Sequence, residues 1–553
     1  MLKNHPKGLF VLFFSNMGER FGYYTMMAIF ALFFESKFGL SVKEVGFVWS
    51  GFLFSIYFLP LFGGILADKF GYGKTIVLGI VLMFTGYGMM GIPGMSMTFI
   101  FISLFVIALG TGFFKGNLVV ILGNLYESQG YKKLHAAAFN IFYMGINIGA
   151  FFAPYAATGI RNWLMAKDGF VYNAKLPGMI YQYLAHSDSY KYLEQLKNLA
   201  SEQMGGPVKD LTQFCHNYVD SLSHGYNAAF VVAALSIVSS LFIFIGFKKY
   251  YKHADIRQSE KIKSDNVVEL TAKQVKDRVF ALLMVFLVVI FFWMAFHQNG
   301  YTLTMFAKNY TASSVGTFTK VFFDITAFLS LIGIIIGLVF LIGKNFKGNM
   351  KKIGGLLVIA GSVLFYYRYT TFAVENKISP ELFQSFNPIF VVFLTPIVLG
   401  FFTWLAKKGY EPSPPKKMGI GMMILGAAWL LMALVASGLD SPASLEGIGG
   451  VSSMLVTPYW LIAMYFIMTV SELFISPMGL AYVAKVSPPK LKGTMQGGWL
   501  AATALGNLLS GIVGVPYAKL ALWQTYGLLV VTSLVAGGLM FFMLKKLERA
   551  ASS

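Results

Sequence analysis

The residues of this sequence that could do chemistry are charged side chains set inside long apolar segments. Glu19 and Arg20 are adjacent within the apolar segment 9–35, and Lys115 and Glu472 interrupt two later segments of the same kind. A charged side chain at the centre of a membrane costs at least ~2.5–3.5 kcal/mol, so it persists where it pairs with another charge or lines a watery cavity. The pattern therefore predicts a protein that moves a solute across a membrane.

The composition is that of an integral membrane protein. Of the 553 residues, 56% are hydrophobic and 12% are charged, whereas soluble domains carry about 25% charged residues. The formal net charge is +20, but the Lys and Arg residues lie in short loops between apolar segments. That distribution is the positive-inside pattern of a membrane protein. We therefore expect contact with membrane lipid and no nucleic-acid partner.

The residue types needed for metal, redox or covalent chemistry are scarce. Cys215 is the only cysteine, which excludes an intrachain disulfide and a cysteine-based metal cluster. The seven His residues show no metal-ligand spacing, and the chain has no nucleophile elbow or phosphate-binding loop. We expect no metal, no cofactor and no enzymatic activity.

Fourteen apolar segments are each long enough to cross ~30 Å of hydrocarbon as a helix that rises 1.5 Å per residue. Six lie in the first half of the chain and eight in the second. The predicted spans are 9–35, 44–67, 73–92, 97–124, 137–158, 226–247, 279–306, 321–343, 353–373, 386–405, 417–437, 457–485, 494–518 and 522–544. The sequence therefore predicts an all-α integral membrane protein.

The spans fall into two groups separated by a basic segment. Residues 248–278 contain nine Lys or Arg residues, which predicts a cytoplasmic linker. It would join an N-terminal six-helix lobe, 1–247, to a C-terminal lobe, 279–553. The C-terminal lobe has two spans in excess of six, and we assign them to an inserted helical hairpin, 321–373. Asp324 and Arg368 of this hairpin are expected to cap or snorkel at helix ends.

A polar stretch, 159–225, interrupts the N-terminal lobe and contains no span. Its pattern at 181–199 is helical, so we expect a small ordered cap outside the membrane. If the N-terminus is inside, every strongly basic short loop falls on the same side. These loops contain Lys344, Lys347, Lys351, Lys352, Lys407, Lys408, Lys416, Lys417, Lys485, Lys490 and Lys492. We expect a plasma-membrane protein with both termini cytoplasmic.

The turn after the second span carries a recognisable motif. Residues 64–71 read Gly-Ile-Leu-Ala-Asp-Lys-Phe-Gly and resemble the loop motif of the major facilitator superfamily. There the glycines allow close helix approach, and the Asp meets a helix N-terminus or a basic partner as two lobes rock. The resemblance implies a conformational role for Gly64, Asp68 and Gly71.

Several further motifs resemble those of the proton-coupled oligopeptide transporters, a family within that superfamily. They occur in the family's order and span residues 16 to about 500. The matching segments are 19–24 in the first span, 110–117 in the fourth, 142–149 in the fifth, 386–388 and 411–415 around the eighth, and 471–477 in the tenth. The resemblance implies the major facilitator fold, in which two six-helix lobes enclose a central site.

A peptide is a zwitterion with variable side chains, so a promiscuous site should hold cations at one end and an anion at the other. The resemblance gives the cationic role to Arg20 and Lys115, and the amine-binding role to Glu472 with Asn147 and Asn387. It also implies that phenols and indoles contact the substrate, namely Tyr24, Tyr57, Trp293, Trp460 and Trp499. The aromatic rings could instead pack within the bundle, and the two amides could instead join helices by hydrogen bonds worth ~0.6 kcal/mol.

Three positions depart from the family pattern. Asn16 stands where the family commonly has Glu, Met27 where it has Arg, and His297 where it has an acid. In the family the last two positions form an ion pair between the lobes. Losing both charges avoids leaving one of them unpaired in a low-dielectric site.

Because Asn16 cannot titrate, the candidate proton carriers are Glu19, Glu472 and His297. We hypothesise that Glu19 pairs alternately with Arg20 and Lys115, and that its protonation frees the cations for a peptide carboxylate. His297 could carry a proton near neutral pH, or it could be a polar residue hydrogen-bonded within the bundle.

The function expected from these observations is proton-coupled import of di- and tripeptides by a monomer that alternates access between the two sides of the membrane. One alternative keeps the fold and changes the cargo to another small zwitterion or anion, such as an amino acid derivative or nitrate. A second alternative is a sensor that binds peptide without transporting it.

Overall fold

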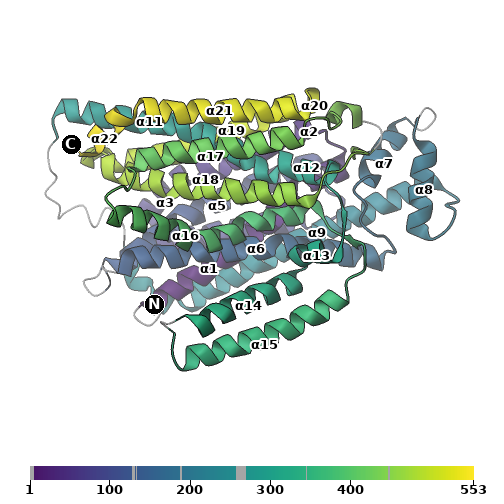
Figure 1. The fold of residues 1–553 in the computed structure, drawn as a ribbon, viewed down its shortest axis with the longest axis horizontal. Helices are drawn as coiled ribbons and strands as arrows, with labels where there is room; N and C mark the ends of the chain where they lie inside the picture. The colour runs from purple at the N-terminus through teal and green to yellow at the C-terminus, as the bar shows by residue number, and fades with distance from the viewer. Residues whose placement is uncertain are drawn as a thin grey trace.

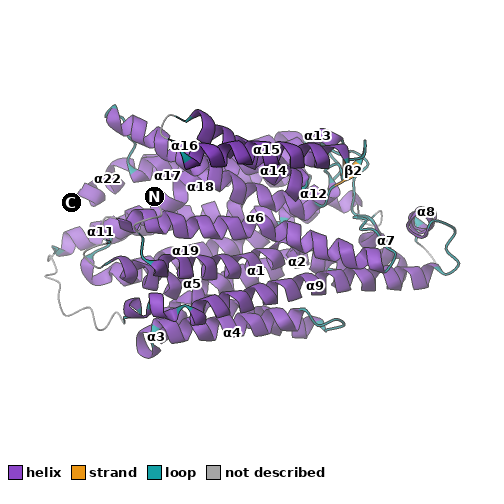
Figure 2. Cartoon of the chain, turned by 90° about the horizontal axis from the view of Figure 1, so that it is seen from below, coloured by secondary structure: helices purple, strands orange, loops and turns teal. Residues whose placement is uncertain are grey.

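The computed structural model describes residues 5–127, 131, 134–186, 190–256, 270–343, 346–445 and 449–552. Helices make up almost all of the regular structure (Figure 2). The long helices run side by side along the longest axis of the molecule (Figure 1). We call the end that carries the N- and C-termini the terminal end, and the end from which α7 and α8 project the cap end (Figure 1).

The described residues of the first half form nine helices, of which α2 and α3 follow one another as a single candidate span and α7 and α8 are short. The bounds are α1 Lys7–Phe38, α2 Val42–Phe58, α3 Pro60–Phe70, α4 Tyr72–Met90, α5 Met97–Tyr126, α6 His135–Lys167, α7 Leu176–Ala185, α8 Leu193–Met204 and α9 Leu211–Gly246. Ser41 and Glu44 form a capping box that begins α2. Pro60 stands at the first position of α3, where its missing N–H is tolerated.

The second half begins with a long helix and the inserted hairpin. The bounds are α11 Ala272–Phe296, α12 Thr302–Asn309, α13 Thr317–Lys320, α14 Ile325–Ile342 and α15 Asn349–Thr370. Two-residue strands, β1 Ser314–Val315 and β2 Asn376–Lys377, pair antiparallel beside the hairpin. Among the short 3-10 helices are η4 Lys248–Tyr250, η5 Lys252–Ala254, η6 His297–Gly300, η7 Val321–Phe323 and η8 Pro380–Ser385.

The remaining helices complete the second half. The bounds are α16 Phe386–Lys407, α17 Pro414–Val435, α18 Pro458–Val486, α19 Lys492–Ile512, α20 Gly514–Lys519, α21 Leu522–Phe542 and α22 Leu544–Ser552. Within the first half α1 packs against α6 and α9, and within the second half α17 packs against α18 and α21. The two halves meet where α2 packs on α19 and α6 packs on α16.

The number of spans agrees with the sequence prediction. Among the described residues, 13 helical segments are long and apolar enough to cross a membrane. The remaining long helix is α1, whose 32 residues include the charges of Glu19 and Arg20. Counted with α1, the described helices provide the 14 predicted spans. The expectation of an all-α membrane protein is confirmed.

The hairpin charges lie at helix ends, as predicted. Asp324 is the N-cap of α14, and its Oδ1 accepts a hydrogen bond of 2.9 Å from the Ala327 N–H. Arg368 lies in the last turn of α15 and forms an ion pair with Asp324. The pair therefore joins the two helices of the hairpin at one end, and α14 and α15 lie together along one side of the bundle (Figure 1).

The region between the fifth and sixth spans differs in detail from the expectation. The helical pattern predicted at 181–199 is divided between α7 and α8. The flanking spans also extend beyond their apolar segments, because α6 continues to Lys167 and α9 begins at Leu211. Of the predicted basic linker, residues 257–269 lie outside the described residues.

Candidate functional site

Glu19 and Arg20 form a bidentate ion pair on α1. The Arg20 Nε lies 2.5 Å from Glu19 Oε2, and Nη2 lies 2.6 Å from Oε1. The Glu19 and Arg20 side chains are 0% and 5% exposed, and the Arg20 guanidinium lies 4.8 Å from the centre of the Tyr23 ring. In this arrangement the Glu19 carboxylate occupies Nε and Nη2 of Arg20, so the guanidinium already has a counter-charge.

Lys115 enters the same region from α5. Its Nζ lies 3.9 Å from the centre of the Tyr57 ring of α2, and it is close enough to Arg20 and Glu19 to interact with both electrostatically. No carboxylate of the described residues forms an ion pair with Lys115. Lys115 is therefore a second cation of the N-terminal half, and a ligand carboxylate could neutralise it.

The second half contributes an acid to this region. Asn387 of α16 donates a hydrogen bond of 2.9 Å from Nδ2 to Glu472 Oε2 of α18, and a second of 3.0 Å to Thr469 Oγ1. Within the described residues no cation forms an ion pair with Glu472. The amide fixes the orientation of the carboxylate and leaves it able to receive an amine.

Tyr24 and Tyr57 lie near charges of both halves. Each phenol is close enough to both Arg20 and Glu472 to interact with them electrostatically. The centre of the Tyr57 ring is also 6.3 Å from the His297 ring, which belongs to the second half. The structure therefore brings Arg20, Lys115 and Glu472 into the neighbourhood of the same two phenols.

His297 and Met27 take the positions at which the family resemblance implied an ion pair. His297 forms a hydrogen bond from Nδ1 to the Asn507 side-chain oxygen of α19. Its ring stacks on Trp293, with the ring centres 4.8 Å apart. Met27 is 4% exposed and packs in the apolar core. An amide hydrogen bond and apolar packing thus replace the charge pair.

Three of the other predicted contact residues have partners or positions of their own in the structure. Asn147 Nδ2 donates a hydrogen bond of 3.1 Å to the Tyr143 carbonyl of its own helix. Trp499 packs its ring over Gly479 of α18, and a Cβ at Gly479 would lie 2.2 Å from that ring. Trp460 is 43% exposed in the first turn of α18, about 18 Å along the helix axis from Glu472.

The turn motif is ordered by a side-chain hydrogen bond. Tyr72 donates from its hydroxyl to Asp68 Oδ1 over 2.6 Å, and Gly71 has φ of 98°, a conformation that favours glycine. The close helix approach in this region occurs at Gly63, where a Cβ would lie 2.3 Å from the Gly112 carbonyl oxygen. At Gly64 no described residue beyond the adjoining backbone of its own helix has an atom within 4 Å of the corresponding position.

Two ion pairs that the sequence did not predict, one fully buried and one largely buried, join the halves near the cap end. Lys308 of α12 pairs with Glu35 of α1, and Arg161 of α6 pairs with Glu381 of η8. Both side chains of the second pair are 0% exposed. Arg161 also donates a hydrogen bond of 3.2 Å to Ser379 Oγ. Glu35 is the last residue of the predicted span 9–35, and the other three charges lie just outside predicted spans, where the sequence suggests ordinary loop charges.

Further contacts close the same end. The Tyr301 hydroxyl donates to the Val42 carbonyl, and the Tyr301 and Trp49 rings stack with centres 6.4 Å apart. Gln384 Nε2 donates to the Ala28 carbonyl over 3.2 Å. The hydrogen bonds and ion pairs between described residues of the two halves all lie between mid-bundle and the cap end. The halves are thus joined at the cap end.

A family model described as the POT family matches residues 73–275 and 360–526. The "Dipeptide and tripeptide permease B" of Xenorhabdus bovienii is 27% identical over 99% of this chain and 97% of its own length. The "Dipeptide and tripeptide permease A" of Escherichia coli is 26% identical over 92% of this chain and 84% of its own length.

Solved structures resemble the fold over its full length. One is a peptide transporter POT mutant in complex with alafosfalin, with a TM-score of 0.68 at 21% identity, covering 100% of this chain and 97% of that chain. Another is a POT family transporter in complex with 5-aminolevulinic acid, with a TM-score of 0.64 at 19% identity, covering 99% of this chain and 98% of that chain. The family match, the full-length relatives and the fold agree: this chain belongs to the POT family and is a multi-pass membrane transporter, not an enzyme.

Proposed function

We propose that this transporter imports di- and tripeptides together with protons, with the peptide bridging the two halves at Tyr24 and Tyr57. The observation that carries the proposal is the convergence of Arg20 and Lys115 with Glu472 around these two phenols. The relatives named as dipeptide and tripeptide permeases support the same cargo.

The charges match the two ends of a peptide. A carboxylate has its complement in Arg20 and Lys115, and an α-amine has its complement in Glu472, which Asn387 orients. Tyr24 and Tyr57 can hydrogen-bond the peptide backbone between its ends. Because the backbone and both termini are common to all short peptides, such a site accepts many side chains.

Proton coupling follows from the competition for Arg20. When Glu19 is ionised it holds the guanidinium in a bidentate pair. Protonation of Glu19 weakens that pair and releases Arg20 to a substrate carboxylate, so proton and peptide binding favour one another. His297, hydrogen-bonded to Asn507, and Glu472 are the other titratable groups of the site.

Transport requires the cap-end contacts to break and re-form. In the proposed cycle two lobes, 1–247 and 279–553, rock about the site, and the linker 248–278 joins them. The basic loops favour a terminal end that faces the cytoplasm, and we infer that the membrane is the plasma membrane. The ion pairs Lys308–Glu35 and Arg161–Glu381 then close the route to the outside in the state described here. Each chain holds a complete site, so a monomer suffices.

A smaller zwitterion is the alternative cargo. One structural relative was solved in complex with 5-aminolevulinic acid, a compound that has an amine and a carboxylate like a peptide but is not one. The same charges could receive such a molecule or a simple anion. The sensor alternative rests on the missing charges at Asn16, Met27 and His297, and it requires binding without accumulation.

The test is uptake of a labelled dipeptide into liposomes that contain the purified protein, with an inward proton gradient. The proposal predicts accumulation that a protonophore abolishes and that unlabelled di- and tripeptides inhibit. Glu472→Gln should lose uptake, whereas Glu194→Gln, which removes an exposed acid of α8, should not. Binding without accumulation would establish a sensor, and competition by single amino acid derivatives but not by peptides would establish the other cargo.

A further inference from the structure

A buried asparagine of α19, Asn507, holds the ring of His297 in one protonation form. The Asn507 side-chain oxygen is hydrogen-bonded to Nδ1 of the imidazole. Because an amide oxygen can only accept a hydrogen bond, the proton lies on Nδ1. In the neutral ring the other nitrogen, Nε2, then carries a lone pair and can only accept.

The backbone around Asn507 is fastened to the helix that leads into His297. A Cβ at Gly506 would lie 2.5 Å from a backbone oxygen of α11, so the two helices are in close contact there. On the other side of Asn507, Gln298 Nε2 donates a hydrogen bond of 2.9 Å to the Ser510 carbonyl. Asn507 itself is 0% exposed. Its contact with the imidazole is therefore built into the packing of α19 on α11 and η6.

The Asn507 amide has a second feature that packing does not explain. Its Nδ2 is buried and has no hydrogen-bond partner among the described residues. A buried donor without a partner destabilises the folded state, and an apolar side chain of similar volume, such as Leu, would remove that cost. Residues that break a rule of stable folding in this way are expected at functional sites.

The ring that Asn507 holds lies beside first-half residues of the candidate site. The ring centres of His297 and Tyr57 are 6.3 Å apart, and Lys115 is close enough to His297 to interact with it electrostatically. Trp293 stacks on the ring, but His297 is only half-buried. Among the described residues, the bond from Nδ1 is the only hydrogen bond of the His297 side chain. Nε2 is thus left to accept from a substrate.

From these contacts we propose that Asn507 is a positioning residue, which keeps Nε2 of His297 as the acceptor for the peptide-bond N–H of the substrate. The proposal rests on the proposed peptide cargo, whose backbone would lie beside the phenols of Tyr24 and Tyr57. The family pattern has an acid at this position, which is an acceptor that carries a charge. A neutral imidazole fixed by an amide supplies an acceptor without that charge, and so it needs no cationic partner at Met27.

The first experiment determines which ring nitrogen carries the proton. Nitrogen NMR of the full chain with labelled histidine is recorded at a pH that keeps the ring neutral, and the signals that disappear in His297→Phe identify this residue among the seven histidines. The parent should have its proton on Nδ1, and Asn507→Leu should lose that single form. A parent with the proton on Nε2, or an unchanged spectrum in Asn507→Leu, would overturn the proposal.

The second experiment tests the substrate donor. It compares the affinity of the full chain for a dipeptide and for the same dipeptide methylated on its peptide nitrogen. In Asn507→Leu and in His297→Phe, methylation should weaken binding about five-fold less than in the parent, which is the worth of one hydrogen bond. In the His297→Phe background, Asn507→Leu should change nothing further, because Asn507 acts through the ring.

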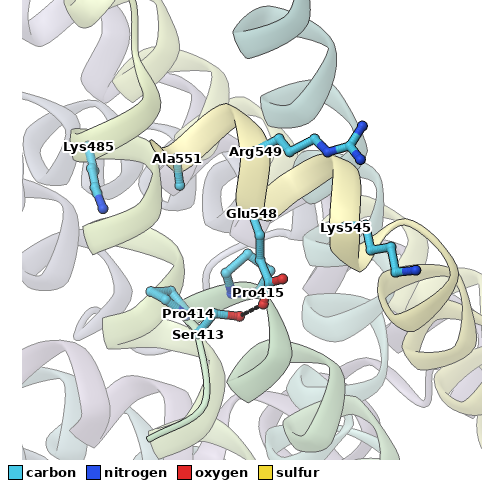
Figure 3. A pocket seen from close by; sticks show the side chains of 8 residues that line it. All are labelled: Ser413, Pro414, Pro415, Lys485, Lys545, Glu548, Arg549 and Ala551. Atoms are coloured by element: carbon cyan, nitrogen blue, oxygen red, sulfur yellow. Dashed lines mark hydrogen bonds between the residues drawn. The ribbon is translucent and has the colours of Figure 1, made fainter. Parts of the chain in front are cut away.

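Two control variants remove polar contacts elsewhere. Asn227→Leu removes a buried asparagine that donates to the Met90 carbonyl over 2.6 Å and whose Oδ1 is likewise unpartnered among the described residues. Ser413→Ala removes a hydrogen bond of 2.5 Å to Glu548 at the terminal end (Figure 3). Both variants should keep the spectrum of His297 and the methylation effect of the parent.

The outcomes separate this proposal from the proposed function. A methylation effect that is the same in the parent, in Asn507→Leu and in His297→Phe would overturn the proposed acceptor. A parent that binds no dipeptide would contradict the peptide cargo, whereas the spectrum would still decide whether Asn507 sets the form of the ring. If Asn507→Leu does not fold, the spectrum of the parent and the methylation effect in His297→Phe give the answer.

Discussion

Lys308 of α12 forms an ion pair with Glu35 of α1 about two turns beyond Met27. The family resemblance implied a charge pair between the same two stretches of chain, at Met27 and His297. In this protein the pair lies nearer the cap end, and its sign is reversed, because the acid belongs to the first half and the base to the second. The interaction between the halves is therefore displaced along the helices.

Substitution of either Lys308 or Glu35 alone should favour the state that is open at the cap end. Lys308→Met leaves Glu35, whose side chain is 19% exposed, without its partner in the closed state, so the closed state loses stability. Peptide uptake should fall, and a cysteine introduced at Met27 in a Cys215→Ser background should react faster with a reagent added at the cap end.

The exchanged variant, Glu35→Lys/Lys308→Glu, is the control for this prediction. It restores an ion pair with the polarity reversed, so uptake and cysteine protection should both recover relative to either single substitution. If the exchanged variant were as impaired as Lys308→Met, the pair would not be the contact that holds the cap end shut.

The Arg161–Glu381 pair should matter more for stability because neither side chain is exposed. Arg161→Met leaves a buried carboxylate unpaired, which costs roughly 3–5 kcal/mol. Arg161→Met/Glu381→Leu removes both charges and should be markedly more stable than the single variant. Thermal unfolding in detergent measures the stability of both variants. If the double variant were as unstable as Arg161→Met, the unpaired carboxylate would not be the cause of the lost stability.

The hairpin pair predicts a pH dependence of stability outside the transport pathway. Burial alone would raise the pKa of Asp324, but hydrogen bonds from Arg368 and the Ala327 N–H outweigh it and hold that pKa below its ordinary value. A depressed pKa in the folded state stabilises the protein above the unfolded-state pKa of about 3.9. That contribution is lost as the pH falls through the lower folded-state value.

Asp324→Asn should therefore lower the unfolding temperature at neutral pH, with a difference from the parent that closes in acid. The side chains of Arg368 and Asp324 are 34% and 12% exposed, so the effect should be about 1 kcal/mol or less. A difference that persists unchanged at the most acidic pH would assign the loss to the α14 cap and not to the ionised carboxylate.

Glu19 gives the prediction that concerns proton coupling. Glu19→Gln cannot release Arg20 by protonation, so uptake should no longer respond to an imposed pH gradient, while exchange of peptide across the membrane should continue. Glu194→Gln, in the cap, should keep the full pH response. A Glu19→Gln protein driven by the gradient as strongly as the parent would exclude this residue as the proton carrier.

The spans and the central charges were accessible from the sequence for a physical reason. A membrane-crossing helix requires about 20 apolar residues, so each span is visible in the sequence as a long apolar segment. Glu19, Lys115 and Glu472 are conspicuous because they interrupt such segments. Periodicity and hydropathy also identified the hairpin, whose charged residues lie at its helix ends.

The cap-end pairs could not be found in this way. Arg161 and Glu381, like Lys308 and Glu35, are far apart in the sequence, and no local pattern connects such partners. These residues also lie at or just outside the ends of the predicted apolar segments, so the sequence suggests that they are solvated. The helix α6 extends to Lys167 and α12 extends to Asn309, past the ends of their apolar segments. Arg161 and Lys308 lie on these extensions and are buried there.

The most direct measurement of the central claim compares the affinity of the protein for a dipeptide, its N-acetylated form and its C-terminal amide. In the parent protein, blocking either end should weaken binding. In Glu472→Gln the acetyl group should weaken binding little further, because the partner of the amine is gone. In Lys115→Gln the amide should weaken binding less than it does in the parent, because one of the two cations proposed to receive the carboxylate is gone. If acetylation weakened binding equally in the parent and in Glu472→Gln, the peptide amine would not meet Glu472, and the bridging arrangement would be contradicted.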